Sequence, residues 1–205
     1  GHSRGAKISM LQATSDPRVR AACLLDPVDN TVYAPLGEGF PSAVAAMRDA
    51  TLSGGACPPL VVVGGMYGGD CAPKGSNYLE FLKAAPAGSW GVEVRAGHFQ
   101  FLDNPTFVQR AVCEEGTAGD ALQVRELSLA LMVAHAETVF RGVPRQPALR
   151  KTLAMLEKSW GAGALDDGDG GGGGGGRKKS SSSSSRGGEA ELPWVVLMDG
   201  SSPST

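Results

Sequence analysis

The sequence predicts an α/β fold in which helices cover both faces of a parallel sheet. Three short apolar runs, at residues 19–25, 60–65 and 90–96, have the length and composition of buried strands. Helical segments lie between and after these runs, so strands and helices alternate along the chain. This alternation is typical of a layered α/β protein.

Each element is supported by a local signal. Residues 4–15 are predicted to form a short helix, and the strand at 19–25 ends before Pro27, which cannot donate to a sheet ladder. A long connector then holds one predicted helix, 42–48, with Ser42 as its N-cap. The remaining predictions are a strand at 60–65, a glycine-rich loop at 66–77, a helix at 78–84, a last strand at 90–96, the longest helix at 120–141 and a shorter helix at 147–160.

The composition changes after the last predicted helix, so the chain is divided into a domain at 1–160 and a low-complexity tail at 161–205. Runs of only glycine or only serine occupy much of this tail. Such a tract buries too little apolar surface to offset its ordering entropy, which predicts disorder at 162–191. The apolar stretch at 193–198 is interpreted as a chance feature, with a docking strand as the alternative.

Charge and cysteine content exclude several classes of protein. The 205 residues carry a net charge of −2, which gives no indication of nucleic acid or of an acidic membrane surface as a partner. No apolar run approaches the roughly 20 residues that span a bilayer. The four cysteines include no C-x-x-C pair, so no zinc site is expected. Free thiols are favoured at Cys71 and Cys113, with a bridge between them as the alternative.

The first five residues, GHSRG, match the G-x-S-x-G pattern of a nucleophile elbow. In such an elbow a sharp turn between a strand and a helix exposes the serine, here Ser3, for attack on a carbonyl carbon. We expect Gly1 and Gly5 to be required because side chains at both positions would collide in the tight turn. The N–H of Arg4, the residue after the serine, would be one oxyanion donor.

A base and an acid for Ser3 follow later in the chain. His98 comes directly after the strand at 90–96, where α/β sheets place their sites, and is the candidate base. Asp26 and Asp70 each follow a buried strand, and the pattern alone leaves the choice of acid between them open. His2 is interpreted as a packed or hydrogen-bonded residue, and His135 as a surface or core residue of its helix, neither with a catalytic role.

The chain order serine, aspartate, histidine is that of the α/β-hydrolases. Because the serine of that fold lies about halfway through the domain, we expect this chain to correspond to its C-terminal half. The other half would hold further strands and the loop with the second oxyanion amide.

Four blocks resemble the chlorophyllase family, whose members carry GHSRGG, DPVDG, CAPKGxN and GHxxxLDD at similar spacing. The corresponding blocks here are GHSRGAK at 1–7, LDPVD at 25–29, CAPKGSN at 71–77 and GHFQFLD at 97–103. The resemblance covers roughly residues 1–145. Ala6 and Asn30 stand where the family patterns have glycine.

The resemblance implies a catalytic triad of Ser3, Asp26 and His98, which favours Asp26 over Asp70. It also implies hydrolysis of the phytyl ester of chlorophyll to chlorophyllide and phytol, without a cofactor or metal. A chloroplast location and peripheral association with pigment-bearing membranes are further implications, and the homopolymeric runs suggest a green-algal source.

A phytyl ester would need a wide apolar groove, and glycines 64, 65, 68 and 69 would let a flat ring approach the backbone. Candidate lining residues are Val32, Tyr33, Leu36, Phe40, Met66, Tyr67, Phe99 and Phe101. Two alternative functions stay open. One is a different carboxylesterase or lipase on the same scaffold, and the other is an inactive or partner-binding fragment.

Overall fold

The computed structural model describes residues 1–55, 57–113, 121–163 and 195–199. Its helices and strands, in chain order, are α1 (Arg4–Ser15), β1 (Ala22–Leu25), α2 (Ala43–Leu52), β2 (Leu60–Tyr67), the 3-10 turn η1 (Gly69–Cys71), α3 (Tyr78–Lys83), β3 (Trp90–Gly97), α4 (Phe107–Val112), α5 (Ala121–Arg141), α6 (Arg145–Gly163) and β4 (Val195–Asp199).

The sheet has the order β1-β2-β3-β4. The first three strands are parallel, with Leu24 opposite Val62 and Val63 opposite Val92. This part confirms the α/β prediction. On the far side of β1, His2 forms an isolated parallel bridge with Leu25, so the residues before Ser3 pair with the sheet.

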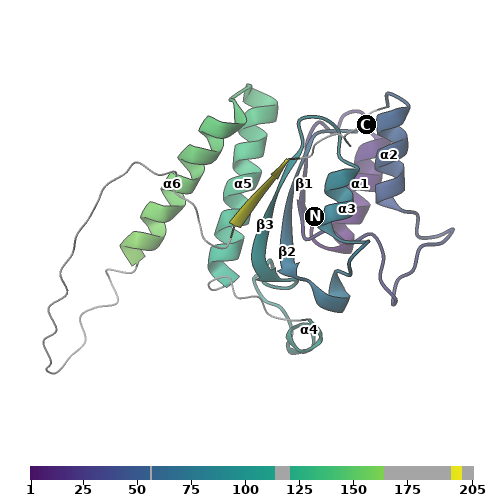
Figure 1. The fold of residues 1–205 in the computed structure, drawn as a ribbon, viewed down its shortest axis with the longest axis horizontal. Helices are drawn as coiled ribbons and strands as arrows, with labels where there is room; N and C mark the ends of the chain where they lie inside the picture. The colour runs from purple at the N-terminus through teal and green to yellow at the C-terminus, as the bar shows by residue number, and fades with distance from the viewer. Residues whose placement is uncertain (56, 114–120, 164–194, 200–205) are drawn as a thin grey trace, which may run out of the picture.

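Helices cover the sheet on both faces (Figure 1). Helices α1, α2 and α3 lie on one face, and α5 and α6 lie on the other. Successive residues of β2 point to opposite faces, so Leu60 and Val62 pack beneath the first group while Val61 and Val63 pack beneath the second. All four of these side chains are fully buried, which explains why the run carries no polar residue.

Most predicted elements are confirmed, with shifts at their ends. The Ser42 hydroxyl accepts a hydrogen bond from the Ala45 N–H at 3.0 Å, as expected of the N-cap of α2. Helix α6 extends to Gly163, so the first two residues of the segment predicted to be disordered are helical. The rest of that segment, 164–191, lies outside the described residues.

Two elements were not predicted. Helix α4 begins with a capping box, in which Thr106 accepts from the Gln109 N–H and the Gln109 side chain accepts from the Thr106 N–H. Strand β4 falls in the apolar stretch that was interpreted as a chance feature, and it pairs antiparallel with β3 (Figure 1). That interpretation is therefore wrong, and β3 is not the last strand of the sheet.

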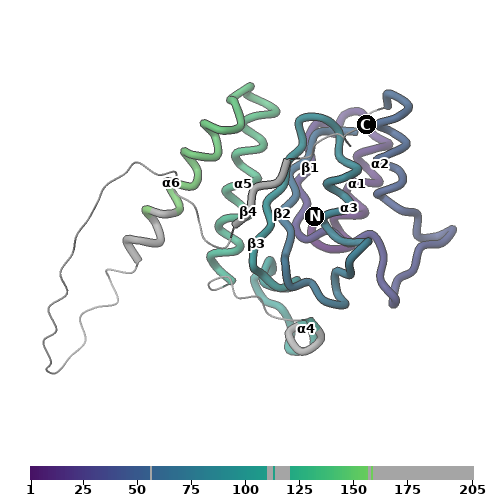
Figure 2. Tube along the Cα trace, in the orientation of Figure 1, coloured from purple at the N-terminus to yellow at the C-terminus, as the bar shows by residue number. Residues whose placement is uncertain are grey.

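The connections that follow β1, β2 and β3 all leave the sheet at its carboxyl edge. The trace in Figure 2 shows the long connector between β1 and α2 projecting from the body of the molecule. Among the described residues, no helix is long and apolar enough to cross a membrane.

Candidate active site

Ser3 lies in a sharp turn between a short extended segment and α1. The Leu25 N–H donates to the Gly1 carbonyl at 2.9 Å, and the Ser3 N–H donates to the Leu25 carbonyl at 3.0 Å. Ser3 has φ 55° and ψ −128°, a conformation that residues with a side chain rarely adopt. The two hydrogen bonds to Leu25 hold the turn in this strained conformation. The serine side chain is therefore presented at the start of α1.

The two glycines of the elbow differ in the space that a side chain would find there. A Cβ on Gly1 would lie 2.6 Å from the Gly5 carbonyl oxygen and 2.7 Å from the Ala6 nitrogen, both backbone atoms that cannot move aside. A Cβ on Gly5 would meet nothing within 4 Å. The steric prediction is therefore confirmed at Gly1 and wrong at Gly5, because the close approach lies on the strand side of the turn.

Ser3, His98 and Asp26 form a continuous chain of hydrogen bonds. The Ser3 Oγ lies 2.9 Å from His98 Nε2, and His98 Nδ1 lies 2.6 Å from Asp26 Oδ2. Because a carboxylate only accepts, the proton of neutral His98 is on Nδ1, which leaves the Nε2 lone pair facing the serine hydroxyl. The structure thus brings Ser3 and His98 together with Asp26, which the sequence pattern alone had left level with Asp70.

Both oxygens of Asp26 have partners. While Oδ2 accepts from His98, Oδ1 accepts from the Gly65 N–H at 2.9 Å. Asp26 has φ 38° and is fully buried, and its own N–H donates to the Val63 carbonyl at 2.6 Å. The carboxylate is therefore fixed by β2, the neighbouring strand, and can hold the His98 ring in one orientation.

Gly65 is a residue whose role the sequence did not reveal. A Cβ there would lie 2.8 Å from the Ala96 carbonyl oxygen and 3.4 Å from Asp26 Oδ2. The absence of a side chain lets the N–H reach the carboxylate between two strands. The Tyr78 ring fills the space that a Cβ on Gly64 would need, so a flat ring cannot approach the backbone there. For glycines 65, 68 and 69 that expectation stays a prediction.

His2 supports the loop that carries His98. The His2 Nε2–H donates to the His98 carbonyl at 2.8 Å, and the two imidazole rings lie 4.8 Å apart. Burial, followed by the nearby His98, lowers the pKa of His2. A neutral His2 places no second positive charge against the His98 ring. The hydrogen bond to the His98 carbonyl confirms the interpretation of His2 as a hydrogen-bonded residue.

The segment after His98 is anchored to α5. Arg125 Nη1 donates to the Leu102 carbonyl at 3.0 Å, and Arg125 Nε lies 2.8 Å from Asp103 Oδ1. Closer to the histidine, the Gly97 N–H donates to Gln100 Oε1 at 2.7 Å. The base is thus held by contacts from two directions, the extended segment at His2 and the helix behind the sheet.

Asp70, the nearby Asp29 and the third histidine lie in other surroundings. Asp70 is exposed in η1, and His98 is bonded to Asp26 instead. Asp29 accepts from the Ala43 N–H at 2.7 Å and from the Ser42 hydroxyl at 2.5 Å, so it anchors the start of α2. His135 is 1% exposed within α5, so of the surface and core positions that were left open it occupies the core one.

An oxyanion donor is available beside Ser3. Arg4 is the first residue of the 12-residue helix α1, so its N–H has no acceptor within its own helix. The aligned peptide dipoles of α1 also favour negative charge at this end. The Arg4 backbone therefore has the position and polarity to stabilise an oxyanion formed at Ser3.

A disulfide joins Cys71 to Cys113, with their Cα atoms 6.0 Å apart. The preference for free thiols was wrong at these two positions. One cysteine follows β2 and the other follows β3, and neighbouring parallel strands bring their following segments to the same edge of the sheet. Cys23 and Cys57 are free.

The candidate groove residues fall into three groups. Val32 and Tyr33 are 83% and 84% exposed, whereas Phe101 is 5% exposed and belongs to the core beneath α5. Phe99 lies between these extremes, with its ring edge-on to His98 at 5.0 Å. Phe101 is therefore excluded as a lining residue, and Phe99 borders the base directly.

A hollow of about 570 Å³ lies between the end of β2 and α3. Its wall includes Met66, Tyr67, Lys74, Tyr78 and Glu93, and none of the three hydrogen-bonded site residues. Over the described residues, no group of three or more histidine, cysteine or acidic side chains has the arrangement of a metal site.

The arrangement has the parts needed for nucleophilic attack on a carbonyl carbon. It combines a hydroxyl, a neutral imidazole as base, a buried carboxylate that orients the imidazole, and a backbone donor for the developing oxyanion. Comparison of the chain with protein-family models, with curated proteins and with solved structures finds no match in any of the three.

Proposed function

We propose that this chain carries the catalytic triad of a serine esterase of the α/β-hydrolase fold, with Ser3 as nucleophile, His98 as base and Asp26 as the orienting acid. The observation that supports this most strongly is the pair of hydrogen bonds that link the three side chains. The three side chains come from three separate turns or loops at the carboxyl edge of the sheet, and each is held by further contacts. Packing alone does not account for this convergence.

The proposed reaction has two stages. His98 Nε2 takes the hydroxyl proton as Ser3 Oγ attacks the ester carbonyl, and the Arg4 N–H stabilises the oxyanion of the tetrahedral intermediate. His98 then gives its proton to the departing alcohol, which leaves an ester between Ser3 and the acid. Water, deprotonated by His98, releases the acid and restores the serine.

Asp26 keeps its charge throughout this cycle. It holds the proton of His98 on Nδ1 and stabilises the imidazolium that forms in each stage. Its burial and its second hydrogen bond, from the Gly65 N–H, restrict the carboxylate to this role. Burial of an ionised carboxylate is costly unless it is paired, so this arrangement supports a functional rather than incidental contact.

For the substrate we propose the phytyl ester of chlorophyll, hydrolysed to chlorophyllide and phytol in the chloroplast. Support comes from the four sequence blocks shared with the chlorophyllase family, which include all three triad residues. Phe40, which is exposed and lies against the Arg4 guanidinium, and Phe99, which borders His98, are also compatible with a hydrophobic ester.

The test compares chlorophyll with short-chain nitrophenyl esters as substrates for the 205-residue chain. Chlorophyllide formation that is lost in Ser3→Ala would support the proposal, and chromatography of the pigments measures it directly. Ser9→Ala is the matched control because Ser9 is exposed on the same helix, with its hydroxyl bonded to the Gly5 carbonyl at 2.9 Å.

The outcomes separate the alternatives. Cleavage of short esters without chlorophyllide would assign a different carboxylesterase or lipase. A folded chain that cleaves neither substrate would favour an inactive fragment. Equal loss of activity in Ser9→Ala and Ser3→Ala would count against Ser3 as the nucleophile.

A further inference from the structure

Exposed apolar side chains gather on two projections at the carboxyl edge of the sheet. One projection is the connector between β1 and α2, and the other is α4. We name their large exposed side chains the apolar rim: Val32, Tyr33, Leu36, Phe40, Phe107 and Val108. Four of them are at least 67% exposed.

The backbone of the connector forces its side chains outward. Thr31 and Ala34 exchange two backbone hydrogen bonds of 3.1 and 3.3 Å, which leaves Val32 and Tyr33 at the tip of a tight turn. Gly37 and Phe40 exchange a second pair, of 3.3 and 2.9 Å. Turn tips normally carry glycine, asparagine, aspartate or serine, so a valine-tyrosine tip that cannot fold back onto the core is unusual.

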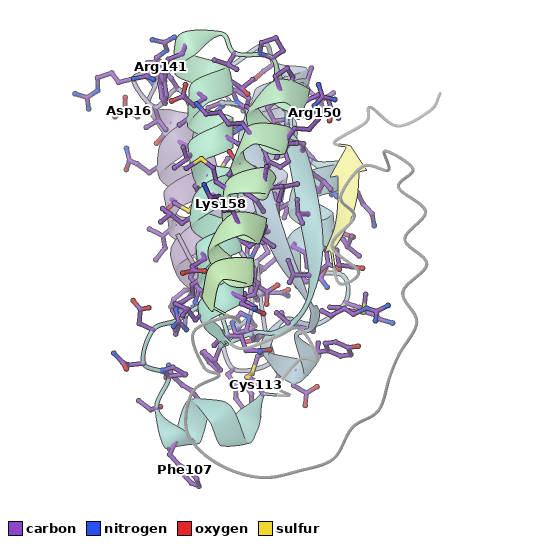
Figure 3. The ribbon with its side chains drawn as sticks, turned by 90° about the vertical axis from the view of Figure 1, so that its left-hand side faces the viewer. Asp16, Phe107, Cys113, Arg141, Arg150 and Lys158 are labelled. Atoms are coloured by element: carbon purple, nitrogen blue, oxygen red, sulfur yellow. A yellow bond between two sulfur atoms is a disulfide. The ribbon has the colours of Figure 1, made fainter. Side chains whose placement is uncertain are left out.

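Helix α4 presents its aromatic residue in the same manner. Phe107 is the first residue of this helix and is 85% exposed. In Figure 3 it points away from the body of the molecule at one end. The capping box at Thr106 and the disulfide at Cys113 hold the helix on both sides, so Phe107 is fixed in an outward position.

The rim adjoins the candidate active site. The Phe40 ring lies beneath the Arg4 guanidinium, 6.0 Å from its Cζ, and Arg4 follows Ser3 directly. The second projection follows β3 and the His98 loop in the chain. Figure 1 shows the connector and α4 at the same end of the molecule, the lower end in that view.

We propose that the apolar rim inserts into an electrically neutral lipid surface and so turns the mouth of the Ser3 site toward that surface. Glu38 is the one charged residue in the connector segment 30–42, Arg4 lies against Phe40, and α4 contains Arg110, so the charges beside the rim are few and of mixed sign. Large apolar side chains without a cluster of cations favour the hydrocarbon boundary of a neutral layer.

The shape of the rim favours lipid over a second copy of the chain. A stable protein interface needs roughly 800 Å² of contiguous, complementary surface on each partner. The rim consists instead of two turns and one helix end that project separately. A fluid layer adapts to separate projections, whereas a rigid partner would need matching pockets.

This inference rests on the proposed function in one respect: an esterase for a water-insoluble ester has a reason to face lipid. The binding itself can be measured without any hydrolysis. The Ser3→Ala chain, which the proposed mechanism makes inactive, should bind lipid as the parent chain does.

The experiment is flotation of the 205-residue chain with phosphatidylcholine vesicles in a density gradient, because aggregates sink while vesicle-bound protein rises. The parent and Ser3→Ala should float equally well at low and high salt. The Val32→Ser/Tyr33→Ser double variant and Phe107→Ser should each bind at least about tenfold more weakly, since each loses large apolar groups that the lipid would bury.

Leu52→Ser is the matched control. Leu52 is 86% exposed and is the last residue of α2, outside the rim, so its loss should leave flotation unchanged. Circular dichroism of each variant checks that the fold is retained.

Several results would overturn the inference. These are a folded parent chain that does not float, an equal loss of flotation in Leu52→Ser, and flotation that requires anionic lipid or disappears at high salt. A dimer that dissociates in the Val32→Ser/Tyr33→Ser variant, with no flotation of the parent, would assign the rim to a second copy. Flotation without hydrolysis of any ester would sustain the inference while removing the proposed function.

Discussion

The orientation of one imidazole ring depends on contacts at both of its nitrogens and at its backbone. His98 Nδ1 donates to Asp26, Nε2 faces Ser3, and the His98 carbonyl accepts from His2. With these contacts the ring is 2% exposed, so water has little access to the bonds that set its tautomer. The three side chains are therefore preorganised for the proposed reaction.

Asp26→Asn should lower kcat/KM for ester hydrolysis by about 10³- to 10⁴-fold, because an amide nitrogen toward His98 favours the wrong tautomer. The measurement is steady-state hydrolysis of a soluble ester by the folded variant. Asp70→Asn is the matched control, since Asp70 is exposed and also follows a buried strand. A harmless Asp26→Asn together with an inactive Asp70→Asn would identify the other acid.

Residue types and their order were enough to select Ser3 and His98, but not to choose between two aspartates. The pattern left Asp26 and Asp70 level, because each follows a strand and strand ends converge at one edge of the sheet. The choice of Asp26 came from the family resemblance, and the His98–Asp26 hydrogen bond agrees with it. The part played by Gly65 had no signal in the sequence, because it depends on the approach of two strands and a carboxylate.

At the scale of elements, the disulfide connects the segments that follow β2 and β3. It joins η1 to the residue after α4, across a sequence separation of 42. The segment between these cysteines contains β3 and the His98 loop. In the loop-entropy model, closing such a segment destabilises the unfolded chain and so raises the free energy of unfolding.

Cys71→Ser should lower the free energy of unfolding by about 2–4 kcal/mol, which corresponds to a fall in Tm of roughly 5–15 °C for a chain of this size. Calorimetry under non-reducing conditions measures it. Cys57→Ser is the control, because Cys57 is a half-buried free cysteine. Equal and small shifts in both variants would show that the bridge contributes nothing to stability.

Elements with strong local signals were predictable, and those that depend on distant partners were not. The apolar run of β2 is easily recognised, since a strand buried on both faces carries few polar residues. Strand β3 keeps enough apolar residues to be recognised although Glu93 and Arg95 interrupt its run. Helix α4 spans six residues, too few for a helical period to stand out, although Thr106 and Gln109 have capping-box spacing. Strand β4 depends on pairing with β3, about a hundred residues earlier, which a local pattern does not contain.

In the molecule as a whole, different segments pair with the two outer strands of the parallel sheet. Strand β4 covers the outer edge of β3, while Gly1–Ser3 pairs with the outer edge of β1. Both edges carry backbone groups that need partners. The expectation that the chain corresponds to the C-terminal half of a hydrolase domain stays a prediction.

Stability should fall as the pH drops below about 6.5, because buried histidines are kept neutral in the folded chain. Burial lowers the pKa of His135, and burial followed by the nearby His98 lowers that of His2. Between the two pKa values of such a histidine, the unfolded chain binds more protons than the folded chain. Each histidine therefore contributes fully to the free energy of unfolding above its pKa in the unfolded chain. That contribution is lost as the pH falls through its pKa in the folded chain.

His135→Gln should therefore make the dependence of Tm on pH shallower between pH 7 and 5.5, since an amide retains a donor toward the Pro59 carbonyl without titrating. Thermal unfolding of both chains across this range tests the point. A slope unchanged by the substitution would mean that other groups carry the pH dependence.

Covalent labelling with an alkyl fluorophosphonate measures whether His98 and Asp26 activate Ser3. This reagent phosphonylates an activated serine, forming an Oγ–P bond with loss of fluoride, and requires no knowledge of the substrate. Mass spectrometry of the digested chain should find the label on Ser3, at a rate reduced by at least about 10³-fold in His98→Gln. Labelling of Ser3 at the same rate in folded His98→Gln, or no labelling of Ser3 in the folded parent chain, would contradict the account.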